Sequence, residues 1–159
     1  MQMLRGSKLT LLLGTLITSA APYFLPLALP GLVMIAASRK AFNPNLKDSI
    51  YTPSFQRLTA WFLLVLALLE GITGFGAGPQ TSTLVSDLTF GLLNRGNSLQ
   101  FHILLIGPLT FFFILHSASG LGSMLLRRGV KNVLIFELVI PAIMITLYAL
   151  AIYMYALLL

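Results

Sequence analysis

The stretch Ser98–Met124, SLQFHILLIGPLTFFFILHSASGLGSM, is one long apolar segment that contains both histidines of the chain. Its length and hydropathy predict a helix that crosses a membrane. His102 and His116 are fourteen residues apart, which at about 100° per residue returns the helix to within about 40° of the same face. That spacing rises about 21 Å, compared with about 30 Å for the apolar layer of a membrane. We therefore expect both imidazoles to face one way, near opposite borders of that layer.

The composition of the whole chain also indicates a membrane location. Of its 159 residues, 57% are hydrophobic and 9% are charged, and so short a chain cannot bury that much apolar surface in a water-soluble core. We therefore expect an integral membrane protein. The absence of cysteine excludes iron–sulfur ligation and disulfides from this chain. The net charge of +6 comes from basic residues that cluster beside apolar segments, so we expect contacts with anionic lipid and no nucleic-acid partner.

The apolar segments predict an all-α bundle of four transmembrane helices in a single domain. The spans are expected over about residues 9–38, 58–78, 98–126 and 132–159. The first run contains three prolines, and we expect a single kinked, tilted helix; a re-entrant hairpin that turns at Pro22–Pro26 is the alternative. Between the second and third spans, leucines at helical spacing from Leu84 to Leu92 predict a short interfacial helix.

The second span carries an acidic residue and a row of glycines. Glu70 lies about twelve residues into the span, where an unpaired carboxylate is costly. We expect it to be neutral, paired, or beside a cavity filled with water or quinone; proton handling is the functional interpretation, and packing against a partner subunit is the alternative. Gly71, Gly74 and Gly78 remove side chains from one face, which lets a neighbouring helix or a flat macrocycle approach the backbone.

Small residues also follow the second histidine. Gly120 lies one turn beyond His116 on the same face, and its missing side chain leaves room for a ring bound to that histidine. Pro108 predicts a bend between the two histidines. A lone histidine on an apolar helix is more often a packing residue than a ligand. Two intramembrane imidazoles on nearly one face need partners, however, and such residues usually mark function.

Two histidines with thirteen residues between them on a membrane helix resemble the haem-bearing helices of b-type cytochromes. The segment His116–Gly122, with the basic end Arg127–Lys131, is also similar to the haem-anchor subunits of succinate dehydrogenases. The resemblance covers about one helix of the four expected. The chain departs from the anchors in having an arginine where they usually carry an acidic residue, and from the bc type in lacking a second pair of histidines.

The resemblance implies a membrane subunit that binds one or two haems b and carries electrons between a quinone pool and a partner redox subunit. Catalysis would belong to that partner, and this chain would have no catalytic residue. The histidines would be axial ligands of the iron, each completed by a methionine, water, or a histidine from another subunit or a second copy of the helix. Glu70 would serve quinone protons. The residues expected at the cofactor are His102, His116, Gly120, Gly71 and Gly74.

Two further expectations concern the class of protein and its orientation. The alternative function is a non-haem accessory or structural subunit of a respiratory or photosynthetic complex that binds lipid, quinone or pigment. For both functions we expect the protein to be integral to an energy-transducing membrane, which means a prokaryotic plasma membrane or an organelle inner membrane. Seven basic residues belong to the loops over residues 39–57 and 127–131, against Arg5, Lys8 and Arg95 elsewhere. By the positive-inside rule we expect both loops inside and both termini outside.

Overall fold

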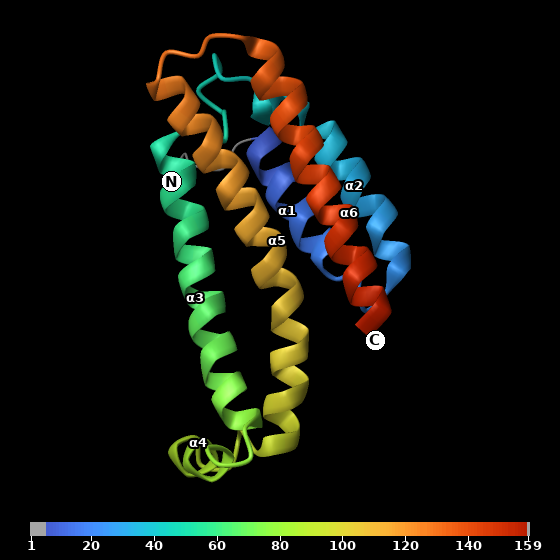
Figure 1. Cartoon of the computed structure of the whole chain (residues 1–159), viewed down its shortest axis with the longest axis vertical. Helices are drawn as coiled ribbons and strands as arrows, with labels where there is room; N and C mark the ends of the chain where they lie inside the picture. The colour runs from blue at the N-terminus through green and yellow to red at the C-terminus, as the bar shows by residue number, and fades with distance from the viewer. Residues whose placement is uncertain (1–5, 159) are drawn as a thin grey trace.

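Two long apolar helices dominate the computed structural model, which describes residues 6–158. Helices α3 (Pro53–Ala77) and α5 (Arg95–Arg127) pack antiparallel, and the short helix α4 (Ser82–Leu88) lies across one end of the pair (Figure 1). Helix α6 (Ile140–Leu158) packs on α5. The all-α prediction is confirmed for the described residues. Within residues 6–158, three segments are long and apolar enough to cross a membrane, which is compatible with a membrane protein: Pro53–Ala77, Arg95–Arg127 and Ile135–Leu157.

Local sequence explains where the long helices begin and end. Pro53 occupies the first turn of α3, where its missing N–H group has no intrahelical partner to lose. The side chain of Asn94 caps α5 by accepting a hydrogen bond from the backbone N–H of Asn97 at 3.0 Å. Helix α5 ends before Gly129, whose φ of 81° suits glycine. Pro108 lies inside α5 without ending it.

The first apolar run is not one helix. Helices α1 (Ser7–Ser19) and α2 (Ala28–Ala37) form an antiparallel hairpin, joined through a turn and a 3₁₀ segment, η1 (Leu25–Leu27). The single kinked span expected over residues 9–38 is therefore wrong, and the hairpin alternative is observed. The arms have 13 and 10 residues, fewer than the roughly 20 that a crossing helix needs. The four-span bundle is thus not confirmed, and the interfacial location of α4 stays a prediction.

Small residues explain why the hairpin closes. A Cβ atom at Gly31 would lie 2.2 Å from Thr18 Oγ1 and 2.7 Å from the Thr18 backbone nitrogen. A Cβ atom at Gly14 would lie 3.0 Å from the carbonyl oxygen of Gly31. Such close backbone approach requires glycine. The turn itself contains Pro22 and Pro26, which cannot donate to a helical hydrogen-bond ladder.

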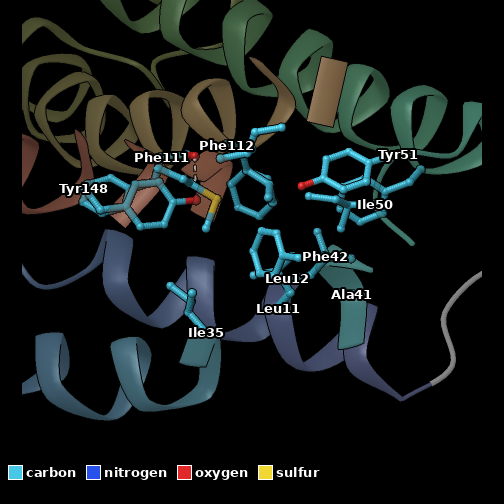
Figure 2. Packing of buried hydrophobic residues seen from close by; sticks show 14 of the residues in the cluster. Leu11, Leu12, Ile35, Ala41, Phe42, Ile50, Tyr51, Phe111, Phe112 and Tyr148 are labelled. Carbon is cyan, nitrogen blue, oxygen red and sulfur yellow. Dashed lines mark hydrogen bonds between the residues drawn. The ribbon is translucent and has the colours of Figure 1, made fainter. Parts of the chain in front are cut away.

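The hydrophobic core lies where the hairpin meets α5 and α6. Leu11 of α1, Phe111 of α5 and Tyr148 of α6 are each 0% exposed, and the rings of Phe111 and Tyr148 lie side by side in Figure 2. The Tyr148 hydroxyl donates to the carbonyl of Phe111 at 3.1 Å and lies 3.2 Å from Thr15 Oγ1. The one polar atom of this large buried side chain is therefore satisfied.

Two shorter helical segments flank this core. A 3₁₀ turn, η2 (Arg39–Phe42), follows α2, and a π-helical segment, η3 (Ile135–Val139), precedes α6. The hydroxyl of Tyr51 donates to the carbonyl of Phe136 at 2.7 Å, and the two rings pack edge to face with centroids 5.3 Å apart. This contact ties the π-helical segment to the start of α3.

The hairpin also changes the predicted topology. Lys8, at the start of α1, lies 4.0 Å from Asp48 (Nζ to Oδ1) and donates to the carbonyl of Lys47 at 3.4 Å. Burial lowers the pKa of the Lys8 ammonium group, and the charge of Asp48 opposes that shift. The start of α1 therefore lies at the same end of the bundle as the loop before α3, and α6 ends away from it (Figure 1). The expectation that Lys8 lies opposite that loop is wrong; Arg5 lies outside the described residues.

Few described residues cover the half of the α3–α5 pair that lies next to α4 (Figure 1). From the hairpin turn, Tyr23 reaches it by donating to the carbonyl of Ile103. Exposed apolar side chains that lie together on one surface usually face lipid or another protein. The exposed side chains on this half include Leu68, Ile72, Phe75, Leu99 and Leu104.

The glycine contact of the hairpin gives a stability prediction. We expect Gly31→Ala to lower the free energy of unfolding by roughly 1–3 kcal/mol, because its methyl group would overlap Thr18. Gly71→Ala is the matched control, since nothing lies within 4 Å of its Cβ position and alanine favours a helix. Thermal unfolding in detergent, followed by circular dichroism, measures both variants. Equal effects of the two substitutions would contradict the hairpin contact.

Candidate functional site

His102 of α5 contacts Glu70 of α3. Its Nδ1 atom lies 3.1 Å from Glu70 Oε1 and 3.2 Å from the Glu70 carbonyl oxygen. Both oxygens are acceptors, so Nδ1 carries a proton and donates. In the neutral imidazole this leaves the lone pair on Nε2, the nitrogen that remains for a ligand. Because the His102 side chain is 33% exposed and that of Glu70 is 13% exposed, the pair lies at the edge of the bundle rather than in its core.

The pair lines a groove with a volume of 690 Å³ on the α3–α5 surface. Gly71 and Gly74 form part of the α3 side, and Gln80 and Thr81 border it from the connection to α4. A Cβ atom at Gly71 would meet no atom within 4 Å, whereas one at Gly74 would lie 3.1 Å from His102 Cε1. Gly71 therefore keeps the groove open, and Gly74 leaves the space that the imidazole needs against α3.

One oxygen of Glu70 has no partner among the described residues. Oε2 is buried without a hydrogen bond, while Oε1 faces His102. A buried acceptor left without a donor costs about 1–3 kcal/mol. Such atoms in native proteins are usually satisfied by a ligand, a water or a proton. The structure thus places Glu70 in a pair and beside a cavity, and its role in proton handling stays a prediction.

His116 also faces α3, but in different surroundings. Its Nδ1 atom lies 2.8 Å from Thr59 Oγ1. Thr59 donates its own proton to the carbonyl of Phe55 or Gln56, at 3.1 and 3.2 Å, so its oxygen accepts the proton of His116 Nδ1. Neutral His116 then has the same tautomer as His102. The prediction that both imidazoles face one way is confirmed, because both contact α3.

The space beside Gly120 holds a side chain of α3. A Cβ atom at Gly120 would lie 3.5 Å from Gln56 Oε1. Gln56 Nε2 donates to Ser119 Oγ and, at 3.4 Å, to the carbonyl of His116. Gly120 and Gln56 also line a separate cavity near the end of α5, and His116 is not part of that lining. Of the predicted residues, Glu70, Gly71 and Gly74 therefore gather at His102, while His116 and Gly120 lie apart from that groove.

The partner of His116 on α3 was not predicted, although the sequence holds a signal for it. Thr59 lies eleven residues before Glu70, which returns a helix to within about 20° of the same face. One face of α3 thus carries a polar residue for each histidine of the antiparallel α5. Gln80 and Thr81 could not be found this way, because they lie in a connection where no helical period applies.

The groove beside His102 fits a flat cofactor better than a bare metal ion. No group of three or more His, Cys, Asp or Glu side chains that could hold a metal occurs among residues 6–158. A haem brings four nitrogen ligands with its iron and requires only axial ligands from protein. The groove of 690 Å³ falls within the range of about 300–1,000 Å³ that is usual for ligand sites. Its glycines would let a ring approach the backbone of α3.

Comparisons of the chain with protein-family models, with curated proteins and with solved structures find no match. The side chains themselves are therefore the guide to function. The strongest arrangement is the pair of His102 and Glu70 at the groove.

The contact between His116 and Thr59 predicts a spectroscopic change. In Thr59→Val the imidazole loses its acceptor, so we expect the ¹⁵N signals of His116 to move from the Nδ1–H tautomer towards a mixture of tautomers. Thr73→Val is the matched control, because Thr73 donates to the carbonyl of Leu69 at 2.8 Å in the same way and bonds no histidine. Solid-state ¹⁵N NMR of histidine-labelled protein measures the tautomers. Identical spectra for the two variants would contradict the contact.

Proposed function

We propose that this chain is a membrane subunit that binds haem b in the groove beside His102 and carries electrons between a quinone pool and a partner redox subunit. The observation that carries the proposal is that Glu70 holds Nδ1 of His102, at the border of a glycine-lined groove, and so leaves Nε2 as the free nitrogen. The resemblance of the histidine spacing to b-type cytochromes supports the same function. Catalysis at a substrate belongs to the partner.

The residues of the groove have separable roles in this proposal. Bound haem supplies a one-electron redox centre. Glu70 fixes the tautomer and the ring orientation of His102 and would raise its basicity as a ligand, because a carboxylate that accepts the Nδ1 proton enriches the ring in electron density. Gly71 and Gly74 admit a ring close to α3, and Phe75 and Leu109 of the lining keep water from it. The unpartnered Oε2 of Glu70 is available to a proton or to the head group of a quinone.

Among residues 6–158 the groove is lined by no histidine besides His102 and by no methionine, so a second protein ligand for a haem held there would come from outside this lining. Met144 is 0% exposed in the core, and Met124 lines the cavity that contains Gly120. A partner subunit or a second copy of this chain is therefore the source that we propose. His116 remains the candidate ligand for a second haem, although Thr59 and Gln56 surround it here.

The charges support the expected orientation of both basic loops and of the end of α6, and they change only the side on which α1 begins. With the hairpin in place, eight of the nine basic residues described lie at the end of the bundle where α1 and α3 begin, and Arg95 lies at the other. By the positive-inside rule we propose that this basic end is cytoplasmic, with α6 ending on the outer side and His102 nearer the outer surface. The eight residues are Lys8, Arg39, Lys40, Lys47, Arg57, Arg127, Arg128 and Lys131.

The haem proposal predicts a pigment that depends on His102. The purified, dithionite-reduced protein should show the α band of a b-type cytochrome. His102→Ala should lose the haem of the groove, because no other histidine and no methionine among residues 6–158 lines it. Haem per chain in His116→Ala decides the haem number: full retention means one haem, and loss of half means two. A correctly folded wild-type protein without the band would support the alternative, an accessory subunit that binds quinone, lipid or pigment.

The orientation predicts which loops react with an impermeant reagent. The chain has no cysteine, so Asn45→Cys and Thr83→Cys, both at exposed positions, provide single reporters for the two ends. In intact cells a membrane-impermeant maleimide should label Thr83→Cys, and it should label Asn45→Cys only after lysis. The reverse pattern would contradict a cytoplasmic basic end.

A further inference from the structure

A second cavity, with a volume of 600 Å³, lies between α3 and α5 at the basic end of the bundle. Arg57 of α3 and Arg127 of α5 both line it, together with the polar side chains of Gln56 and Ser123. It is separate from the groove at His102, which shares none of these residues. Two arginines from neighbouring helices thus line one cavity.

Among the residues that the structure describes, no acidic side chain lines this cavity. The ion pairs found within residues 6–158 are Lys8 with Asp48 and His102 with Glu70, so neither Arg57 nor Arg127 forms one within that range. Guanidinium groups bind phosphate and carboxylate oxygens through two parallel hydrogen bonds. The charge of the cavity is therefore complementary to a phosphate group.

The remaining lining is apolar. Met124 and Leu126 of α5 form part of the wall, which a freely soluble anion would not need. Trp61 follows Arg57 by one turn of α3 and is 67% exposed. An exposed tryptophan on a membrane helix is typical of the level of the lipid head groups. The cavity therefore lies near the level of the lipid head groups, carries positive charge and has an apolar wall. These three properties match an amphiphile with an anionic head group.

We propose that this cavity binds an anionic phospholipid, with its phosphate between Arg57 and Arg127 and its acyl chains along the surface that carries Trp61. Basic pockets between membrane helices on the cytoplasmic side bind lipid head groups in this way. The inference does not depend on haem, because it uses residues at the opposite end of α5 from His102. The proposal is that anionic lipid binds at one defined cavity, in addition to the general attraction of the basic end for anionic lipid.

Trp61 supplies the probe for this site, because it is the only tryptophan of the chain and lies about 6 Å along the helix from Arg57. The full-length protein is placed in nanodiscs of unlabelled phosphatidylcholine that contain increasing fractions of acyl-brominated phosphatidylglycerol or acyl-brominated phosphatidylcholine. We expect brominated phosphatidylglycerol to quench the fluorescence at a mole fraction at least fivefold lower than brominated phosphatidylcholine. Equal quenching by the two lipids would overturn the proposal.

Paired variants distinguish a site from general attraction. Arg57→Gln with Arg127→Gln should abolish the preference. The matched control is Arg39→Gln with Arg128→Gln, which removes the same charge from exposed positions at the same end but outside the cavity and should keep it. Equal loss in both pairs would overturn the proposal in favour of diffuse attraction.

Two further arms complete the test. If the first pair does not fold, as judged by circular dichroism, the single variants Arg57→Gln and Arg127→Gln take its place, and each should weaken the preference at least twofold. Unchanged preference in both would overturn the proposal.

Inorganic phosphate at 50 mM should leave the quenching by brominated phosphatidylglycerol in place, apart from the screening that chloride at equal ionic strength also causes. Specific reversal by phosphate would identify a soluble-anion site and overturn the assignment to lipid.

Discussion

The structure depends on the packing of α3 against α5, two helices that are each long enough to cross a membrane. They approach closely because glycines lie where the other helix brings a side chain: Gly74 opposite His102 and Gly76 opposite Ser98. A Cβ atom at Gly76 would lie 2.2 Å from Ser98 Oγ, so a larger residue would separate the helices. This packing sets the polar residues of α3 against the histidines of α5. The candidate site follows from it directly.

The hairpin and α6 pack on one half of this pair, and α4 lies at the other end. The hairpin and α6 enclose a core around Phe111 and Tyr148 near the basic end, while the half beside α4 keeps apolar residues on its surface. An enclosed half supplies rigidity, because its buried polar groups are satisfied and its rings interlock. The open half leaves His102 and Glu70 accessible from the side. That division suits a subunit whose cofactor or quinone must also contact a partner.

Sequence alone predicted the long helices and the common face of the histidines, because both depend on the period of a single helix. It also placed Glu70, Gly71 and Gly74 near one another, and the groove contains all three. Hydropathy favours a single span over the hairpin for residues 9–38, because it counts apolar residues and contains no information about the contact of Gly31 with Thr18. The prolines of the first run were the available signal. The contact of Gln56 with Gly120 depends on how two helices pack, which no single helix encodes.

An experimental structure of the protein purified from its own membrane tests the central claim most directly. Density for a planar macrocycle in the groove, with its metal within bonding distance of His102 Nε2 and with Glu70 still bonded to Nδ1, is the predicted result. A groove filled by acyl chains or by a partner's side chains, with His102 Nε2 engaged in an ordinary hydrogen bond, would contradict it.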